Sequence, residues 1–382
     1  MKIYLVTPMD LKYSYRATEY YIYEYAKYLK DNGKDVEILV TKKPNEKYTL
    51  ILNYRKTIRP YRKIKQKPVQ CKLYTIPLLK WHFFFYKNLP KDGVIYLPFT
   101  VYDYVFNILT KPRGQKYVIG SHSLDLKKGH ILEGHEFVEK LVNSVVKSIF
   151  LLIGKEKKNI FFHVINTEQA KYIKKYFKYP NSNIFYAPNF IEMEKYKLGE
   201  NKSKKLKVIH IGGIDKEADI VFDIIKLLDK KGQLNNFDFY FVGNAPDLER
   251  YEITEPENIH ILGKISELEK LKLLSSSDCI IIPAYESFSK TLLEGIASGL
   301  YILTSKKNAA WKDFKKAGIK MFVSENGKAE DYLKILNNLA KQKQKGEKAR
   351  RYKIHNIEIL KKNYTKTKVL PKIFDMFEKV KR

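Results

Sequence analysis

Residues 279–299 read CIIIPAYESFSKTLLEGIASG, which predicts a strand, a short loop and a helix in direct succession. The apolar run from Cys279 to Ile282 is typical of a strand that is buried on both faces. The helix is expected to begin near Ser289, whose hydroxyl can accept a hydrogen bond from the first unpaired amides. Because the start of a helix favours negative charge, this segment predicts an anion site that could hold a pyrophosphate.

The same alternation of strands and helices extends over most of the chain in both directions. In the first half it predicts a helix at 18–32, ended by Gly33, and strands at 2–6, 36–40, 50–53, 93–97, 117–120 and 161–165. After the polar stretch 198–205 it predicts a helix at 218–231 and strands at 206–211, 237–242, 259–262, 279–282, 301–303 and 321–323. Beyond residue 330 the pattern is helical only.

Strands that alternate with helices imply parallel sheets covered on both faces. A chain of 382 residues also exceeds what one hydrophobic core usually fills. We therefore predict an α/β protein of two doubly wound, Rossmann-like domains at 1–200 and 201–360, followed by a helix at 361–382 that packs back towards the first domain. Such domains bind ligands at the carboxyl ends of their strands, so a cleft between the domains is the expected site.

The composition favours a cytoplasmic protein. Its two cysteines, Cys71 and Cys279, lie far apart in the sequence and suggest no disulfide framework, which suits a reducing compartment. The first residues lack the charged lead and the length of a secretion signal. The most apolar stretch, 141–153, is too short to span a bilayer.

The formal charge of +30 is compatible with polyanionic partners, but the lysines are spread over the whole chain, and a solvated lysine-rich surface explains most of this charge. The densest basic run precedes an aromatic stretch at 81–86, and it consists of Arg55, Lys56, Arg59, Arg62, Lys63, Lys65 and Lys67. This combination would suit an anionic membrane surface or single-stranded nucleic acid. A solvated loop followed by a core element is the competing interpretation.

Two glutamates of the opening stretch are candidates for ligand binding. Glu286 lies in the loop before the predicted helix and Glu294 lies inside that helix, so the two carboxylates could address two parts of one ligand. The alternative is that Glu286 only favours the helix start and that Glu294 is a solvated helix residue.

With seven residues between them, Glu286 and Glu294 resemble the signature of retaining GT-B glycosyltransferases of family 4, the glycosyl transferases group 1. Further segments resemble landmarks of that family in the same order, namely 187–191, 209–213, 241–246, 261–265 and 275–280. The resemblance spans residues 164–305, whereas the N-terminal domain matches in outline only. It implies a GT-B fold and transfer of a hexose from a UDP- or GDP-linked sugar, with retention of configuration and without a metal or other cofactor.

The resemblance also implies roles for individual residues. Glu294 would bind the ribose hydroxyls, and Glu286 would face the donor sugar as a catalytic residue. The remaining donor-binding candidates fall into three groups. Gly212, Gly213 and Gly243 would let the backbone approach the donor closely, and Lys264 and Ile265 would lie beside the nucleotide base. Ser287, Phe288, Ser289 and Thr291 lie at the start of the predicted helix. His122 follows a predicted strand, where the family often has a histidine near the sugar, although an isolated histidine is more often structural.

The sequence departs from the family at the phosphate site. The usual arginine after the first glycine is replaced by Gly213, and the usual lysine falls at Ala218. Lys216 or Lys290 could supply the missing charge, because a flexible ammonium reaches a phosphate without bidentate geometry. Lys290 is preferred as a catalytic residue since it lies at the helix start, whereas Lys216 fits an ordinary exposed lysine.

Metal binding is not expected, because no Asp-X-Asp lies near a strand end and no Cys/His cluster has ligand spacing. The acceptor could be a lipid-linked glycan, a protein or a small molecule, with the enzyme in the cytoplasm or at the membrane periphery. Two rival interpretations are a GT-B sugar-nucleotide epimerase and a non-catalytic basic protein that binds nucleic acid or membranes on an inactive scaffold.

Overall fold

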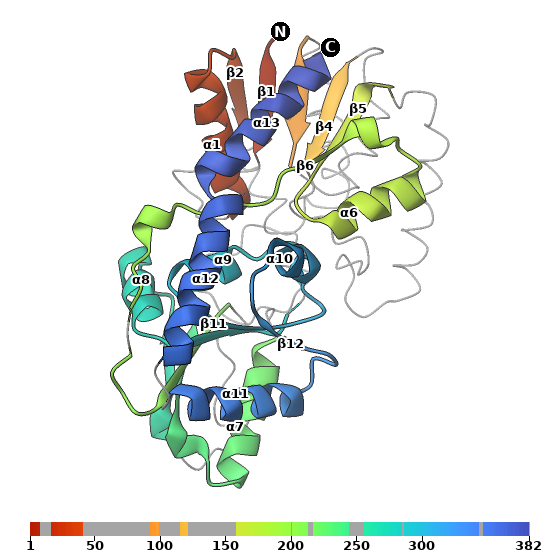
Figure 1. The fold of residues 1–382 in the computed structure, drawn as a ribbon. Helices are drawn as coiled ribbons and strands as arrows, with labels where there is room; N and C mark the ends of the chain where they lie inside the picture. Colours follow the sequence, from red (N-terminus) through yellow and green to blue (C-terminus); the bar gives the residue numbers. More distant parts are fainter. Residues whose placement is uncertain are drawn as a thin grey trace, which may run out of the picture. The chain divides into compact units, whose positions relative to one another are not determined.

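A computed structural model of the protein describes residues 1–7, 17–40, 92–98, 115–120, 158–199, 201–212, 217–243, 256–284, 286–343 and 347–381. The chain divides into two compact units. Unit 1 comprises Met1–Ala187 together with Leu370–Arg382, and unit 2 comprises Pro188–Val369. Both ends of the chain therefore belong to unit 1 (Figure 1).

Unit 1 contains a six-stranded parallel sheet in the order β2-β1-β3-β4-β5-β6. Its strands are β1 (Ile3–Thr7), β2 (Val36–Val40), β3 (Val94–Leu97), β4 (Lys116–Gly120), β5 (Ile160–Val164) and β6 (Ile184–Tyr186). Helix α1 (Ala17–Asp31) lies between β1 and β2 in the chain and buries Tyr21, Tyr25 and Leu29. After β5 come α6 (Thr167–Tyr172), a π-helical turn η4 (Ile173–Phe177) and a 3-10 turn η5 (Asn181–Asn183).

Unit 2 contains a second six-stranded parallel sheet, in the order β12-β11-β10-β7-β8-β9. Its strands are β7 (Leu206–Ile211), β8 (Phe237–Val242), β9 (Ile259–Gly263), β10 (Cys279–Ile282), β11 (Tyr301–Ser305) and β12 (Phe322–Ser324). The helices between and after them are α7 (Ala218–Lys230), α8 (Glu267–Ser275), α9 (Lys290–Ala297), α10 (Trp311–Ala317) and α11 (Ala329–Lys343). Short 3-10 turns are η6 (Met193–Lys195), η8 (Leu234–Asn236) and η10 (Pro256–Asn258).

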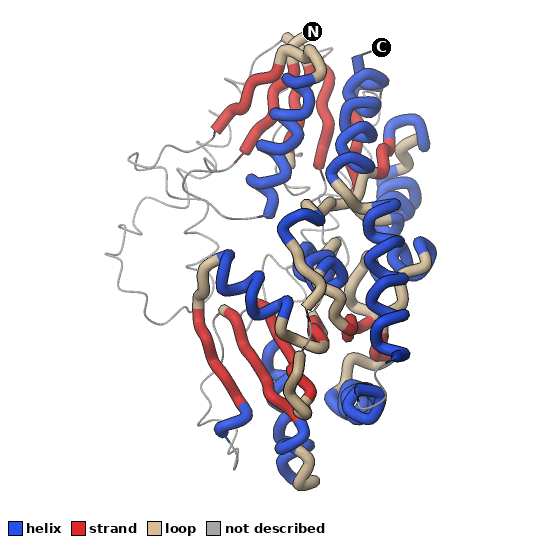
Figure 2. Tube along the Cα trace, turned by 60° about the vertical axis from the view of Figure 1, so that its left-hand side comes forward, coloured by secondary structure: helices blue, strands red, loops and turns tan. Residues whose placement is uncertain are grey.

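The core of unit 2 lies between its sheet and two helices. Val221 and Leu228 of α7 and Leu336 of α11 pack with Phe237 and Phe239 of β8 in one buried cluster. Figure 2 shows the strands of the sheets side by side with helices alongside them. Strand β10, in the middle of this sheet, is apolar and fully buried, as is typical of a strand whose two faces are both covered.

Two final helices, α12 (Glu347–Asn363) and α13 (Lys366–Lys381), carry the chain from unit 2 back into unit 1. The last turns of α13 pack within unit 1. There Glu378 forms an ion pair with Lys34 at 2.5 Å, and the Phe377 ring lies 6.1 Å from the Tyr96 ring. In the part of the chain that the structure describes, no helix is long and apolar enough to cross a membrane.

The predicted fold class is confirmed by these two helix-flanked parallel sheets. Strands β2, β7, β8 and β10 have the predicted bounds, and the other predicted strands that are described differ by one or two residues at an end. Strand β6 was not predicted, because its run of three residues at the edge of the sheet is too short to indicate a strand. The strand predicted at 50–53 lies outside the described residues.

The two units divide at a different point from the predicted boundary between residues 200 and 201. Strand β6 and Ala187 belong to unit 1, and the chain enters unit 2 at Pro188. Three residues later, the Ile191 amide donates a hydrogen bond of 2.9 Å to the Tyr364 carbonyl within unit 2. Residues 188–199, which were assigned to the first domain, therefore belong to unit 2.

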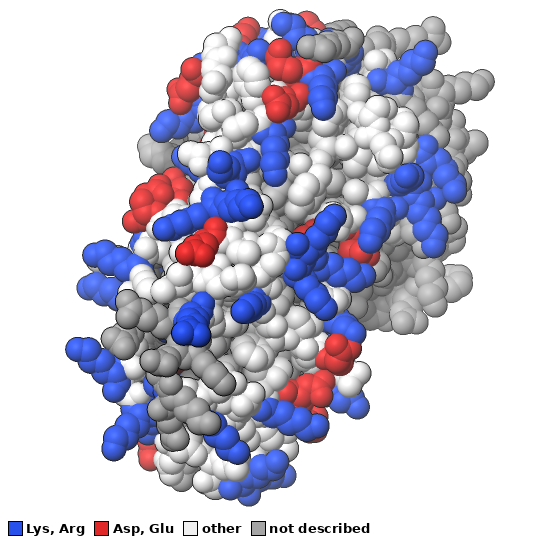
Figure 3. Space-filling model, viewed as in Figure 1, with Lys and Arg blue, Asp and Glu red and all other residues white. Residues whose placement is uncertain are grey.

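Lysine and arginine side chains are scattered over the face shown in Figure 3 and outnumber the acidic ones there. This distribution agrees with the interpretation of the charge of +30 as a solvated, lysine-rich surface.

A buried histidine joins three elements of unit 1. His163 on β5 is fully buried, with its Nδ1 2.7 Å from the Tyr96 hydroxyl and its Nε2 2.8 Å from the Ala187 carbonyl. Burial lowers the pKa of His163 to about 4, against a smaller raising effect of the Ala187 hydrogen bond. The ring is therefore neutral, and because a carbonyl only accepts, Nε2 carries the proton and Tyr96 donates to Nδ1.

This burial predicts a specific pH dependence of stability. Since the folded-state pKa is about 4 and the unfolded value is 6.5, the unfolded chain binds more protons between these pH values. The free energy of unfolding therefore falls as the pH falls from 6.5 to 4, by about 3 kcal/mol in total. We expect the melting temperature of the wild type to fall more steeply over this window than that of His163→Leu, as measured by calorimetry. Parallel curves would contradict a buried neutral ring.

Candidate functional site

Three neighbouring strands of unit 2 end in glycines at the carboxyl edge of the sheet. Gly212 and Gly243 follow β7 and β8, and Gly263 ends β9. The Gly243 amide donates to the Gly263 carbonyl at 2.7 Å, and the Gly212 amide donates to the Val242 carbonyl at 2.9 Å. Gly243 has φ +112°, and a Cβ on it would lie 2.4 Å from the Gly212 carbonyl oxygen. These backbones approach one another because no side chain intervenes, which leaves the edge open to a ligand.

The next strand, β10, leads into the helix whose start the sequence predicted. Ser289 is the N-cap of α9, and its hydroxyl accepts a hydrogen bond of 3.3 Å from the Leu292 amide. The loop before it is held by the chain after β11. The Ser305 hydroxyl donates to the Pro283 carbonyl at 2.7 Å, and the Ala309 amide donates to the Glu286 carbonyl at 2.8 Å. The position of Glu286 is thus fixed by backbone contacts.

Two buried asparagines flank residues 286–288, and each has one polar atom that finds no partner among the described residues. Asn189 donates through Nδ2 to the Phe288 carbonyl at 3.1 Å, but its Oδ1 receives no hydrogen bond. Asn308 pairs with Glu286 in a short β-bridge and accepts from the Ala310 amide at 3.1 Å, but its Nδ2 donates to nothing. Since a buried unpaired polar atom costs about 1–3 kcal/mol, these atoms favour a site that a polar ligand completes.

The carboxylate of Glu294 is almost fully buried, with 3% of its side chain exposed. Its Oε1 lies 3.0 Å from Lys270 Nζ and 3.7 Å from Lys290 Nζ, and it accepts a hydrogen bond of 3.2 Å from the Tyr196 hydroxyl. The alternative interpretation of Glu294 as a solvated helix residue is therefore wrong. Helix α9 turns this residue inwards, on the same face as the buried Leu293 and Ala297.

Lys270 on α8 is the nearest cation to Glu294 within the described part of the chain. It also pairs with Glu267 at 2.9 Å, and 15% of its side chain is exposed. Burial by itself lowers the pKa of Lys270, but the Glu294 and Glu267 carboxylates outweigh this effect and raise the pKa above its ordinary value. The site therefore holds a charged ammonium against a buried carboxylate.

Sequence reasoning missed Lys270 and Tyr196 as partners of Glu294. A signal for Lys270 was present, because it lies three and four residues before Leu273 and Leu274, the buried residues of α8. That spacing places Lys270 on the inner face of the helix. Tyr196 follows the turn η6 and gives no such signal, since its contact depends on how the chain enters unit 2.

The structure brings most of the predicted donor-binding residues to the carboxyl edge of the unit 2 sheet. Ser287 is half-buried in the loop, Phe288 is buried against the Phe314 ring at 5.0 Å, and Thr291 is half-buried in the first turn of α9. Lys264 and Ile265 follow β9, with Lys264 exposed and Ile265 half-buried. Three predicted residues lie outside the described residues, namely Gly213, Lys216 and His122.

Among the described residues, no group of three or more His, Cys, Asp or Glu side chains could hold a metal ion. Cys279 is a free thiol buried in β10, and burial raises its pKa well above the ordinary value.

Residues 205–342 match the model of a protein family described as Glycosyl transferases group 1. The sequence of this part of the chain thus resembles group 1 glycosyltransferases. The matched segment lies within unit 2 and contains the glycine turns, Lys270, Glu286 and Glu294. No curated protein sequence matches the chain.

Several solved structures resemble this chain at low sequence identity. WaaG, a glycosyltransferase involved in lipopolysaccharide biosynthesis, has 13% identity and a TM-score of 0.65 over 98% of this chain and 99% of its own. HepE from Anabaena, solved with UDP and glucose, has 12% identity and a TM-score of 0.60 over 99% of each chain. TarM has 16% identity and a TM-score of 0.57, and the match spans 78% of this chain but only 58% of TarM.

At these identities the structural likeness establishes the fold, which is that of GT-B glycosyltransferases. The predictions of a GT-B fold and of a glycosyltransferase are thereby confirmed. The assignment to the retaining family 4 stays a prediction.

The packing of the glycine edge gives a testable difference between two glycines. In Gly243→Ala, the new Cβ would lie 2.4 Å from the Gly212 carbonyl oxygen at a φ of +112°, so we expect a loss of at least about 3 kcal/mol of unfolding free energy. Gly263→Ala is the control. It also has a positive φ but meets nothing within 4 Å, so a loss of about 1–2 kcal/mol is expected in denaturant unfolding. Equal losses would contradict the close approach at Gly243.

The buried carboxylate predicts a second difference, between two lysines of α8. Lys270→Met removes the nearest cation of Glu294 while Lys290 and Tyr196 stay, so we expect a loss of about 2 kcal/mol, less than for an isolated buried pair. Lys272→Met lies on the exposed face of the same helix and should change stability by less than about 0.5 kcal/mol. Thermal unfolding of both variants measures the difference, and similar small effects would contradict the role of Lys270.

Proposed function

We propose that the chain transfers a hexose from a nucleoside diphosphate sugar to an acceptor, with the donor held at the carboxyl edge of the unit 2 sheet. The observation that carries this proposal is Glu294, a buried carboxylate behind the start of α9 that faces two lysines and a tyrosine hydroxyl. A carboxylate with four acceptor positions is well suited to bind a ribose diol. The donors that the described residues supply all contact Oε1, which leaves Oε2 as an acceptor for a ligand.

The start of α9 supports binding of the diphosphate. The first amides of a helix lack intrahelical partners, and together with the helix dipole they favour an anion. Lys290 in the first turn, 32% exposed on its side chain, adds a positive charge at the same place. As the sugar leaves the donor, negative charge grows on the diphosphate, so donors and cations aimed there lower the barrier. Lys290 would thus supply the positive charge that the family's usual arginine and lysine provide at the positions of Gly213 and Ala218.

Glu286 is the residue we assign to the donor sugar. Its backbone is fixed by Asn308 and Ala309, and the unpaired Nδ2 of Asn308 lies buried beside it. A sugar hydroxyl that accepts from this amide would remove an unpaired donor from the interior. The retaining stereochemistry rests on the spacing of Glu286 and Glu294 alone.

The comparisons support the class of donor. HepE, which shares the fold, was solved with UDP and glucose, and a UDP-linked hexose is therefore the first donor to test here. For the acceptor we propose a glycan, with a lipid-linked form as one option, since WaaG acts in lipopolysaccharide biosynthesis. We further propose action without a metal, at the cytoplasmic side of a membrane or free in the cytoplasm. The basic run from Arg55 to Lys67, which would contact such a surface, lies outside the described residues.

Donor binding can be tested by melting temperature, because a ligand that binds only the folded state raises it. We expect one member of a UDP- and GDP-sugar panel to raise the melting temperature of the wild type. In Glu294→Gln, which keeps the shape of the side chain, that rise should fall by more than half. Glu267→Gln is the control, since it removes a carboxylate from the same Lys270 but lies largely exposed.

A ligand-induced rise in melting temperature that persists in Glu294→Gln would contradict the assignment of Glu294 to donor binding. No rise with any nucleotide sugar, combined with salt-sensitive binding of liposomes or nucleic acid, would instead favour the non-catalytic binding protein.

A further inference from the structure

Unit 1 contains a pocket of about 720 Å³ at the amino edge of its sheet. Lys116, Asn159 and Ile184 place it at the starts of β4, β5 and β6, and the last turn of α13 contributes Lys379. The strands of this parallel sheet run away from the pocket, so it lies at the opposite edge from Gly120, which ends β4. Its volume falls within the range of about 300–1,000 Å³ that is usual for small-molecule sites.

The lining of this pocket carries positive charge and no negative charge. Among the described residues that line it, three are lysines and none is an aspartate or glutamate. Lys116 is engaged, because its Nζ donates to the carbonyls of Val380 and Lys381 at 2.7 and 3.1 Å. It thereby offsets the negative end of α13, which would otherwise repel an anion. Lys158 and Lys379 are exposed and form no ion pair with any described residue, so their charge is available to a ligand.

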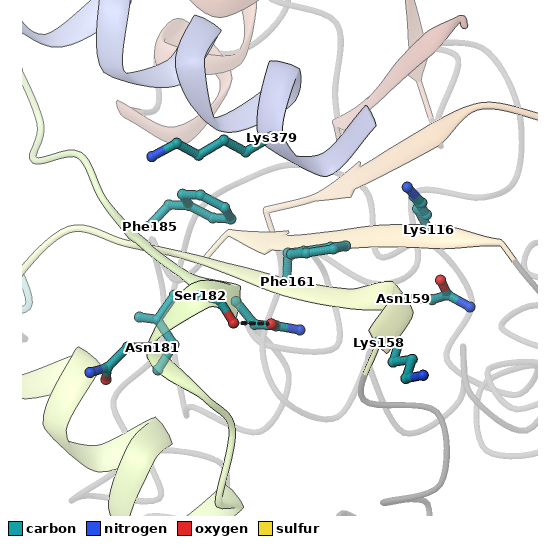
Figure 4. A pocket seen from close by; sticks show the side chains of 10 residues that line it. Lys116, Lys158, Asn159, Phe161, Asn181, Ser182, Phe185 and Lys379 are labelled. Carbon is teal, nitrogen blue, oxygen red and sulfur yellow. Dashed lines mark hydrogen bonds between the residues drawn. The ribbon is translucent and has the colours of Figure 1, made fainter. Parts of the chain in front are cut away.

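Two aromatic rings form an apolar part of the same pocket. Phe161 on β5 and Phe185 on β6 are half-buried, with ring centroids 6.2 Å apart and planes inclined at 39°. Figure 4 shows these rings between Lys379 on one side and Asn181 and Ser182 on the other. A half-exposed ring offers its face to the C–H groups of a sugar ring, which are apolar.

Amides and a hydroxyl complete the lining. Asn183 is committed to the fold, since its Nδ2 donates to the Ile160 carbonyl at 2.9 Å and its Oδ1 accepts from Ser182 at 3.0 Å. The side chains of Asn159 and Asn181 make no hydrogen bond to a described residue. Each can both donate and accept, which is what a ligand rich in hydroxyl groups requires.

From this combination we infer that the pocket binds an anionic saccharide, that is, a sugar bearing carboxylate, sulfate or phosphate groups. The rings take the apolar face of the sugar, the asparagines take its hydroxyls, and Lys158 and Lys379 take its negative charge. Single-stranded nucleic acid fits less well, because it is bound along extended positive grooves with a series of stacking platforms. This site goes beyond the proposed donor site, because it lies within unit 1 and needs no nucleotide sugar.

The test is isothermal titration of the full chain with galacturonic acid hexamer and, separately, with a sulfated heparin hexasaccharide. We expect the anionic sugars to bind more tightly than neutral maltohexaose and to weaken as salt rises. The double variant Lys158→Ala/Lys379→Ala should lose about tenfold in affinity for the anionic probes. Phe185→Leu should weaken binding of all three sugars, because it removes a ring while keeping an apolar side chain.

The control is Lys27→Ala/Lys30→Ala, which removes the same charge from the exposed face of α1 in unit 1. It should change the affinity by less than about twofold. Equal losses in both double variants would overturn the proposal in favour of general attraction to a basic protein. Tight binding of hexauridylate that is lost in the pocket variant, without binding of either sugar, would overturn it in favour of a nucleic-acid site. Because no variant here touches unit 2, the nucleotide-sugar panel reports independently on the donor site.

Discussion

The burial of one negative charge constrains the arrangement of unit 2. A carboxylate with 3% exposure is stable only when cations and hydrogen-bond donors surround it, and Glu294 obtains these from three separate segments. Lys270 comes from α8, Lys290 from the first turn of α9 and Tyr196 from the entry into the unit. The position of α9 relative to α8 is therefore fixed by charge as well as by apolar packing, and the start of α9 faces the edge where the glycines lie.

The glycine turns and the buried carboxylate are complementary in what they offer a ligand. The turns at Gly212 and Gly243 bring backbone to the surface with no side chain in front of it. The other side of the same edge, from Glu286 to Glu294, presents carboxylates, a helix start and a lysine. A ligand with a flat apolar part and a charged part would meet both kinds of surface at once, which is the composition of a nucleotide sugar.

Much of this fold could be predicted from the sequence, because parallel strands that are covered on both faces are apolar throughout. The bounds of β10 follow from such a run, and those of β7 and β8 follow from runs that are mostly apolar. The cap at Ser289 follows from its place before an apolar helix. Strand β6 could not be predicted, since an edge strand of three part-exposed residues carries no pattern. The sequence could place Lys270 on the inner face of α8, but it could not show that Lys270 and Tyr196 contact Glu294, because it does not reveal which segments lie against α9.

Because the net charge is high, a single unpaired lysine is weak evidence for a binding site. With 72 basic and 42 acidic side chains, at least 30 cations have no carboxylate of their own, so an unpaired lysine is the ordinary case in this chain. Paired and buried lysines are the exceptions, and Lys270, 15% exposed against two carboxylates, is one of them. Lys158 and Lys379 differ in another way, because both line the unit 1 pocket together with two aromatic rings and two asparagines. The described lining of this pocket contains no acidic side chain. It is the surroundings of these lysines, and not their charge, that distinguish a site from a solvated surface.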